Sequence, residues 1–363
     1  MLPFSMPRLA LFLVLAAAAL LAPAAAESHA AVPRGFFGVQ VNGPLDQPSV
    51  DLDAEARTMR AAGVESWRVE FAWDQLERDR GSFDFAATDR KVLAAARAGM
   101  DVLGLIVRAP AWANGGNLDP FVPPRSAAAL AGYATALVGR YGPGGSLWAE
   151  HPEVPARPVR AWEVWNEPNL KNYFNVKGSF VRPYARLLRA AAPAIKRADK
   201  GATVLMASMA NYSWRDLARL LKAERRLPFD VAGAHPFSGR PSNALKIVRL
   251  NRAVLNRYGY RKRPMWLTEL TWSSAKGKKT PLTKNWETTE KGQAERLRQA
   301  YRLLLRDRKR LRLARIYWYT WATVDRESKN SFDYSGLRTW TGGSSFVDKP
   351  ALAAFRAVVR AAR

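Results

Sequence analysis

The sequence predicts an α/β fold in which eight strands close into a barrel with helices outside it. From about residue 35 onward, apolar β-rich runs alternate with longer amphipathic helical patterns. Eight strand and helix units can be counted, and no linker or low-complexity segment divides them. Strict alternation requires a parallel sheet covered by helices, and eight units form a single-domain (β/α)₈ or TIM barrel.

The predicted strands are short runs rich in aromatic and β-branched residues, which are typical of buried parallel sheets. A doubly wound open sheet is the alternative, but it needs a glycine-rich phosphate loop after the first strand. The segment VNGPLDQP (41–48) supplies no such loop. In chain order the predicted strands cover 36–42, 66–73, 101–110, 159–166, 203–210, 230–237, 263–272 and 315–323.

Segments rich in Ala, Leu, Arg and Lys lie between these runs and predict the helices. The Gly- and Pro-rich segment 141–158 lies between the third predicted helix and the fourth predicted strand, and it predicts a long loop. The predicted helices cover 51–62, 85–98, 125–140, 180–199, 213–225, 242–258, 289–309 and 350–362.

The first 26 residues have the pattern of a secretory signal peptide. Arg8 precedes an apolar run from Leu9 to Leu21, and small residues that fit A-x-A follow. A membrane anchor is the alternative, although the run is shorter than the ~20 residues that a span needs. We therefore expect a secreted or envelope-associated protein whose barrel domain covers 27–363, with no transmembrane segment after signal removal.

The composition limits the partners and cofactors. The chain contains no cysteine, so disulfides and thiolate metal sites are excluded. The formal net charge of +26 favours electrostatic association with anionic polymers, which for a secreted protein are those of the cell envelope. The basic run 302–315 has leucine at helical spacing and predicts one solvated helix face, so we expect no specific nucleic-acid binding.

Two glutamates stand at the ends of predicted strands. Glu167 follows the fourth strand in WEVWNEPNL (162–170), and Glu269 lies near the end of the seventh in WLTELTW (266–272). Catalytic groups of such barrels come from the C-terminal ends of the strands. Two carboxyl groups about 5–5.5 Å apart are what a retaining glycosidase requires. The sequence therefore predicts a carboxylate pair at the barrel mouth.

These two motifs resemble the signature strands of the clan A glycoside hydrolases, which include cellulase, mannanase, β-xylosidase and β-galactosidase families. The segment 67–85 (WRVEFAWDQLERDRGSFDF), RAPAW (108–112) and the segment 335–355 are also similar to parts of the last two. The resemblance implies that Glu167 is the acid/base and Glu269 the nucleophile. It further implies that Asn166 binds the sugar 2-hydroxyl and that Arg68 steadies the nucleophile.

One motif departs from the clan pattern. Strand six of the clan often carries His-x-Tyr, whereas this chain has His235 and Phe237, so a hydroxyl near the nucleophile is missing. We expect His235, which ends a strand, to be a substrate-binding residue. With three histidines in the chain, a histidine-built metal site is not expected. Glu163 is predicted to be a buried structural carboxylate paired with Arg68 or Arg108.

Two tryptophans are candidate sugar contacts, because apolar sugar faces stack on indole rings. Trp321, near the end of the eighth strand, is the expected platform, and Trp112 is a further candidate. The segment 273–280 (SSAKGKKT) lacks the first glycine of a phosphate loop and predicts a basic loop beside the cleft.

The sequence thus predicts a secreted, retaining O-glycoside hydrolase that acts on a β-linked glycan without metal or organic cofactor. The alternative is a barrel that binds glycans without cleaving them and is held at an acidic cell envelope by its charge.

Overall fold

The computed structural model describes Met1 and residues 32–278 and 286–363. The chain divides into two units, Met1–Ala30 and Ala31–Arg363, and the second contains every described helix and strand. The predicted signal peptide, residues 1–26, lies outside the described residues except for Met1, as do positions 279 and 280 of the predicted basic loop. Within the described ranges, no helix combines the length and the apolar character that a bilayer span needs.

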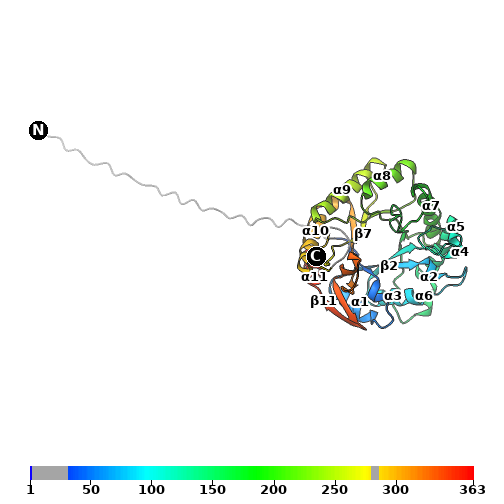
Figure 1. Ribbon diagram of the computed structural model, residues 1–363, viewed down its shortest axis with the longest axis horizontal. Coiled ribbons are helices and arrows are strands. Elements are labelled where there is room, and N and C mark those ends of the chain that lie inside the picture. The colour runs from blue at the N-terminus through cyan, green and yellow to red at the C-terminus, as the bar shows by residue number, and fades with distance from the viewer. Residues whose placement is uncertain (2–31, 279–285) are drawn as a thin grey trace. The chain divides into compact units, whose positions relative to one another are not determined.

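Eight parallel strands close into a barrel in the order of the sequence, and β8 pairs with β1. Figure 1 looks onto the ring of strands, which the helices surround. The predicted (β/α)₈ barrel is therefore confirmed. The strands are Phe37–Val41 (β1), Ser66–Ala72 (β2), Asp101–Val107 (β3), Ala161–Val164 (β4), Thr203–Met206 (β5), Val231–Ala234 (β6), Met265–Leu270 (β7) and Leu313–Trp318 (β8).

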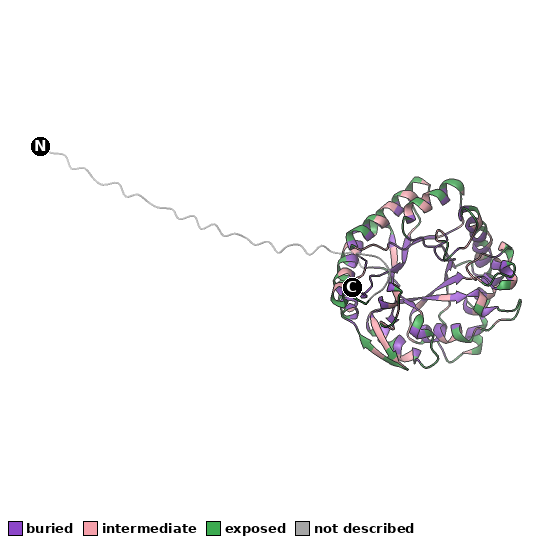
Figure 2. Cartoon of the chain, in the orientation of Figure 1, coloured by how far each residue is buried: buried purple, intermediate pink, exposed green. Residues whose placement is uncertain are grey.

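The helices turn their apolar sides toward the strands, as the purple inner and green outer surfaces of Figure 2 show. Asp51, Ser126 and Thr289 begin α1, α5 and α10 by accepting a hydrogen bond from the backbone of the first turn. The larger helices are Leu52–Ala61 (α1), Ala86–Arg97 (α3), Ala127–Tyr141 (α5), Val181–Ala198 (α7), Ser213–Ala223 (α8), Pro241–Arg257 (α9), Glu290–Leu311 (α10) and Pro350–Ala361 (α11).

The connecting segments contain short elements that the periodicity did not predict. The predicted loop 141–158 includes a five-residue helix, α6. A small sheet of β9, β10 and β11 follows the barrel. The short elements are Gly43–Asp46 (η1), Trp73–Leu76 (α2), Ala111–Asn114 (α4), Ser146–Glu150 (α6), Ala322–Thr323 (β9), Ser331–Tyr334 (η2), Arg338–Gly342 (β10) and Ser345–Asp348 (β11).

The predicted eighth strand, 315–323, is wrong at both ends. The barrel strand β8 begins at Leu313 and ends at Trp318. Thr320 still contacts the barrel through its hydroxyl, which donates to the carbonyl of Gln40 on β1. The chain then joins the small sheet, where Ala322 pairs with Arg338. A continuous run of aromatic residues does not reveal this change of sheet.

The barrel interior has an apolar base and a polar upper layer. Side chains two residues apart on a strand share a face, so Glu163 lies above Ala161 and Thr268 lies above Trp266. The guanidinium of Arg315 lies 4.4 Å from the centre of the Trp266 ring and covers the base. The basal apolar layer consists of Leu103, Ala161, Leu205, Val231, Trp266 and Tyr317.

The packing between the barrel and its helices can be tested at Gly104 on β3. A Cβ atom at this position would lie 2.5 Å from the buried ring of Trp162. We expect Gly104→Ala to lower the free energy of unfolding by about 1–3 kcal/mol, because the ring must shift within a close-packed layer. Thermal denaturation measures this change.

Gly139→Ala on α5 is the matched control, since a Cβ atom there would lie more than 4 Å from the neighbouring atoms that the structure describes. Alanine in a helix interior is favoured over glycine by about 0.5–1 kcal/mol, so this variant should be slightly more stable than the parent protein. Equal losses in the two variants would contradict the packing described here.

Candidate active site

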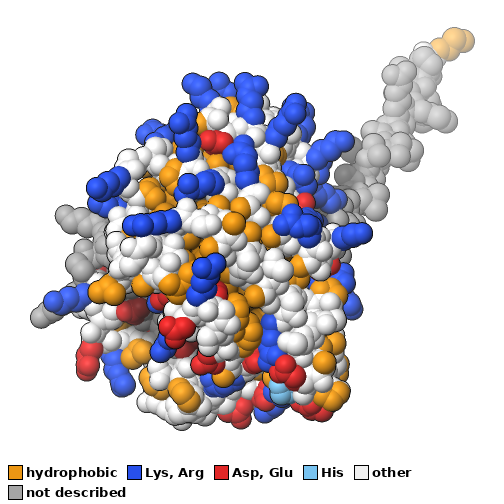
Figure 3. Space-filling view, turned by 90° about the vertical axis from the view of Figure 1, so that its right-hand side faces the viewer, with side chains coloured by type: hydrophobic (Ala, Val, Ile, Leu, Met, Phe, Trp, Pro, Cys, Tyr) orange, Lys and Arg blue, Asp and Glu red, His pale blue; other side chains and the backbone are white. Residues whose placement is uncertain are grey.

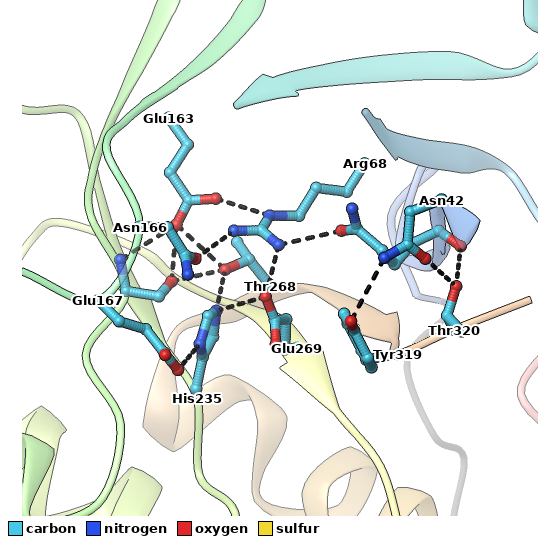
Figure 4. Close-up of polar contacts among 12 residues, drawn as sticks. Asn42, Arg68, Glu163, Asn166, Glu167, His235, Thr268, Glu269, Tyr319 and Thr320 are labelled. Carbon is cyan, nitrogen blue, oxygen red and sulfur yellow. Dashed lines mark hydrogen bonds and ion pairs between the residues drawn. The ribbon is translucent and has the colours of Figure 1, made fainter. Parts of the chain in front are cut away.

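The polar upper layer of the barrel is organised around the guanidinium of Arg68, which is 1% exposed. Its Nε donates to Glu163 Oε2 at 2.8 Å and its Nη1 to Glu269 Oε1 at 2.7 Å. The remaining bonds reach Asn166 Oδ1 at 2.8 Å and Gln40 Oε1 at 3.0 Å. Figure 4 shows the guanidinium of Arg68 between Glu163, Asn166 and Glu269.

Burial alone would lower the pKa of Arg68, but the two carboxylates outweigh it and raise the pKa above its ordinary value. The guanidinium is therefore a fixed positive charge at the floor of the site. The prediction that Glu163 is a buried carboxylate paired with Arg68 or Arg108 is confirmed for Arg68. Arg108 instead pairs with Asp74 at 2.6 Å.

Glu167 lies just beyond β4, where the chain leaves the extended conformation. Trp165 and Glu167 have positive φ values of 74° and 41°, so the simple alternation of strand faces ends at Val164. The amide of Glu167 donates to the carbonyl of Ser208 at 3.0 Å, which fixes this turn against the next loop. The alternation of strand faces predicts that Glu167 points into the barrel, and it does. The reason is this turn and not strand alternation, which ends at Val164.

The carboxyl of Glu167 has the properties of a weak acid at neutral pH. It is 4% exposed, and burial raises its pKa to about 8, with a smaller contribution from the charge of Glu163. The positive charge of Arg68 acts in the opposite direction without cancelling the effect. Glu167 is therefore protonated at neutral pH.

His235 follows β6 and lies between the two carboxyl groups. Its Nδ1 is 2.7 Å from Glu167 Oε1, and its Nε2 is 2.9 Å from the hydroxyl of Thr268. That hydroxyl donates to Glu163 Oε1 at 3.1 Å, so the network assigns the ring proton to Nε2 and leaves Nδ1 as an acceptor. Burial lowers the pKa of His235 to about 4, so the ring is neutral. Its Nδ1 accepts a hydrogen bond from the protonated carboxyl of Glu167.

Glu269 near the end of β7 completes the carboxylate pair. It is 8% exposed, and one of its oxygens lies within 4.8 Å of an oxygen of Glu167. Burial raises the pKa of Glu269 above its ordinary value, and the positive charge of Arg68 opposes this rise. Glu269 has a direct ion pair with a permanent cation and Glu167 has none. Of the two carboxyl groups, Glu269 is therefore the one whose ionised form is stabilised by a direct ion pair.

A cavity of about 310 Å³ lies over this pair at the C-terminal ends of the strands. Its floor includes Arg68, Asn166, Glu167 and Glu269. A small cavity with apolar walls and a few convergent polar groups is the usual form of a binding site for a small molecule. The aromatic walls are Phe121, Tyr173, Phe237, Tyr319 and Phe332, and further polar groups are Gln40, Asn42, Glu70, Asn211 and Asn330.

Five of the seven predicted site residues come together in this place. Arg68, Asn166, Glu167 and Glu269 line the cavity, and His235 lies directly beneath them. The prediction that His235 contacts substrate is wrong, because its side chain is fully buried. It holds Glu167 instead.

The two predicted tryptophan contacts are wrong. Trp321 is fully buried, and its indole N–H donates to Glu55 of α1 at 2.7 Å, because the chain has left β8 three residues earlier. Trp112 lines a separate groove, where its N–H donates to the carbonyl of Glu77 and its ring packs edge-on against Trp73. Neither ring borders the cavity over the carboxylate pair.

Sequence reasoning missed several cavity residues. Glu70 lies two positions after Arg68 on β2, so strand alternation could have identified it. Tyr319 follows the unexpected end of β8, and no periodicity indicates its direction. Its hydroxyl accepts a hydrogen bond from Asn42 at 3.3 Å, and burial together with the charge of Glu269 raises its pKa. Tyr319 thus brings a phenol to the cavity that Phe237 cannot provide.

The ligand atoms of Glu167, His235 and Glu269 lie close enough together to surround a metal ion. However, Arg68 already supplies a positive charge 2.7 Å from Glu269, and Nε2 of His235 is bonded to Thr268. The guanidinium of Arg68 would repel a cation, and Nε2 of His235 could bind one only after losing its bond to Thr268. This donor set fits a hydrogen-bond network better than a metal site.

Comparison with known proteins gives similarity at the level of structure. No protein-family model matches the sequence, and no curated protein matches it. A family 39 glycoside hydrolase from the gut symbiont Bacteroides cellulosilyticus WH2 has a TM-score of 0.67 and 20% identity, over 90% of this chain and 63% of that one. A monomeric beta-xylosidase from Caulobacter crescentus CB15 has a TM-score of 0.64 and 18% identity, over 90% and 68%.

An intracellular xylanase from Thermoanaerobacterium saccharolyticum JW/SL-YS485 has a TM-score of 0.58 and 16% identity, over 89% of this chain and 95% of that one. The present chain thus spans less than two thirds of the Bacteroides enzyme and nearly all of this xylanase. At these low identities the matches show a common fold. The (β/α)₈ barrel that the sequence predicted is the fold of these glycoside hydrolases.

The protonation of Glu167 predicts a pH-dependent stability difference. Its pKa rises from 4.5 to about 8 on folding, so the folded state binds the extra proton between these values and loses stability as the pH rises through them. Glu167→Gln has no such proton. Relative to the parent protein, the free energy of unfolding of this variant should rise from pH 5 to pH 8 by an amount on the order of a few kcal/mol. Its thermal midpoint should rise relative to that of the parent protein in the same direction.

Above the folded pKa the difference should become constant. Denaturation followed between pH 5 and pH 9 measures it, and a difference that does not change over this range would contradict a protonated Glu167 at neutral pH.

Proposed function

We propose that this chain is a secreted glycosidase that hydrolyses O-glycosyl compounds with retention of configuration. The observation that carries the proposal is the approach of Glu167 and Glu269, for which one carboxyl oxygen of each lies within 4.8 Å of the other across one cavity. Retaining glycosidases hold their two carboxyl groups about 5–5.5 Å apart, whereas inverting enzymes leave about 6.5–9.5 Å for a water molecule. The spacing supports direct attack by a carboxylate.

In the proposed first step, Glu269 attacks the anomeric carbon of the substrate, and the bond from that carbon to the leaving oxygen breaks. Arg68 orients Glu269 through the 2.7 Å bond to one oxygen and leaves the other oxygen to form the new bond. Glu167 gives its proton to the leaving oxygen, which departs as an alcohol. The products are a glycosyl ester on Glu269 and an ionised Glu167.

In the second step, Glu167 takes a proton from a water molecule that attacks the same carbon, and Glu269 leaves as a carboxylate. Formation of the ester removes the negative charge of Glu269, so the pKa of Glu167 falls at the stage where it must act as a base. Neutral His235 can bond to both forms of Glu167. It accepts a hydrogen bond from the protonated carboxyl and, after a change of tautomer, donates one to the ionised carboxylate.

The proposed substrate is a β-linked glycan or glycoside, as the motif resemblance implies. Asn166 accepts from Arg68 through its Oδ1, so its amide N–H groups face the cavity and can donate to a sugar hydroxyl. The rings of Phe237 and Phe332, 5.2 Å apart and edge-to-face, provide an apolar wall. One structural neighbour is called a xylosidase and another a glucosidase, and small neutral sugars of this kind suit a cavity of about 310 Å³.

The second candidate is a barrel that binds glycans without cleaving them. Phe237 favours it, because the clan hydroxyl expected at this place is missing. Tyr319 opposes it, because this phenol lies in the same cavity near enough to Glu269 for the carboxylate charge to raise its pKa. Turnover of aryl β-glycosides of xylose, glucose, galactose, mannose and arabinose separates the two functions.

Secretion rests on the signal pattern of residues 1–26. Expression of the full chain in a secreting host should release a protein whose first residue is Glu27, which N-terminal sequencing identifies. Retention of the full-length chain in the membrane fraction would favour the uncleaved anchor instead.

The two carboxyl groups should respond differently to substitution. Glu269→Ala should abolish turnover of every substrate, because the carboxylate that attacks the anomeric carbon is removed. Glu167→Ala should reduce kcat for natural glycosides by about 10²–10⁴-fold, the usual contribution of a general acid, and spare dinitrophenyl glycosides far more. Steady-state kinetics with leaving groups of increasing acidity measures both effects.

Azide is the matched probe for the second variant. It should restore turnover in Glu167→Ala by attacking the glycosyl ester and should give a β-glycosyl azide, because attack from the vacated side preserves configuration. Equal and slight losses in both variants, or an azide of inverted configuration from Glu167→Ala, would overturn the proposed roles.

A further inference from the structure

The positive charge of this protein is concentrated away from the cavity. The junctions between each helix and the following strand form the basal face of a barrel, opposite the mouth. Four consecutive junctions, 196–202, 222–230, 257–263 and 306–312, contain fifteen lysines and arginines against four acidic residues. Figure 3 shows Lys and Arg gathering over the upper part of the molecule, the height at which Figure 1 places α7, α8 and α9.

The four acidic residues of these junctions are already paired. Asp230 contacts Lys196 at 2.7 Å and Arg263 at 3.2 Å, and both partners belong to the same face. Internal ion pairs therefore use few of the cations. The other pairs are Asp199 with Arg160, Glu224 with Arg189, and Asp307 with Arg249, Arg306 and Arg310.

A groove of about 990 Å³ lies on this face between the ends of α8 and α9. Its four cations are exposed, and none of them forms an ion pair with a carboxylate among the residues that the structure describes. The guanidinium of Arg257 lies 5.7 Å from the centre of the Tyr258 ring. The side chains that define this groove are Lys222, Arg225, Arg226, Arg257, Tyr258 and Tyr260.

The walls of the groove are held in place by the fold. The hydroxyl of Tyr260 accepts a hydrogen bond from the amide of Leu227 at 2.8 Å, and its ring stacks on Phe229 at 4.6 Å. Buried Arg252 donates to the carbonyls of Arg263 and Leu311, which joins the neighbouring junctions. The loops that carry the cations are therefore fixed, and a ligand would meet a preformed arrangement of charges.

We propose that this groove binds an acidic polysaccharide, a sugar chain that carries carboxylates. Exposed guanidinium groups bind carboxylates through paired hydrogen bonds, and Tyr258 offers a ring on which the apolar face of a sugar can pack. A bare phosphate polymer would use the cations and leave the tyrosines without a role. The site lies at the opposite end of the barrel from the cavity, so binding leaves the mouth open and does not depend on the proposed hydrolysis.

The test uses the full secreted chain and polygalacturonate as the probe. The variant Lys222→Gln/Arg225→Gln/Arg226→Gln/Arg257→Gln should bind this polymer about tenfold or more weakly at physiological salt, because four counterion-releasing contacts are lost. The control variant replaces Arg57, Arg60, Arg298 and Arg302, four exposed arginines of α1 and α10, with glutamine and should bind as the parent protein does. Calorimetric titration measures both, after thermal denaturation has confirmed that each variant is folded.

Both variants have the same net charge, so equal losses would mean that the overall charge attracts the polymer and would overturn the groove. Tighter binding of inorganic polyphosphate, duplex DNA or anionic phospholipid vesicles than of polygalacturonate would also overturn it. Turnover of neutral aryl glycosides should be the same in the groove variant and the parent protein. A protein without turnover that still binds the polymer through these four cations would therefore refute the proposed hydrolysis alone.

Discussion

The buried guanidinium of Arg68 is the interaction on which the upper half of the barrel depends. Its four hydrogen bonds join β2 to side chains from the neighbouring β1 and from β4 and β7, which are distant in the sequence. A buried charge is tolerated only where its partners fill every direction, so each of these side chains is constrained by the others. The same contacts that satisfy the cation determine where the two carboxyl groups of the cavity lie.

This arrangement divides three buried glutamates into different chemical states. Glu163 and Glu269 share the cation, whereas Glu167 contacts a neutral imidazole whose other nitrogen is bound to Thr268. The carboxyl group of Glu167, which does not contact the cation, keeps its proton. Glu163 and Glu269, which contact the cation, balance its positive charge. In the proposed mechanism, the difference between the acid and the nucleophile thus follows from which carboxyl group contacts the guanidinium.

The fold and the centre of the candidate site could be predicted from the sequence because both depend on local patterns. Alternating strand and helix segments define the barrel, and residues at strand ends must reach its mouth. The failures lie where the chain departs from regular structure. Trp321 was assigned to the cavity on the assumption of a longer eighth strand, and Tyr319 and Phe332 reach the cavity through turns that no periodicity describes. His235 is likewise enclosed by its contacts with Glu167 and Thr268, which come from other strands and which no local pattern indicates.

The basal apolar layer closes the barrel at the end opposite the mouth. Among the described residues, side chains such as Trp266 and Tyr317 fill this lower end, and the cavity opens at the other. A cavity of about 310 Å³ holds about ten water molecules, and a seated sugar expels most of them. In the proposed reaction, the hydrolytic water arrives from the mouth, on the side that the departing alcohol vacates. The leaving group and the water that replaces it thus pass through the same opening.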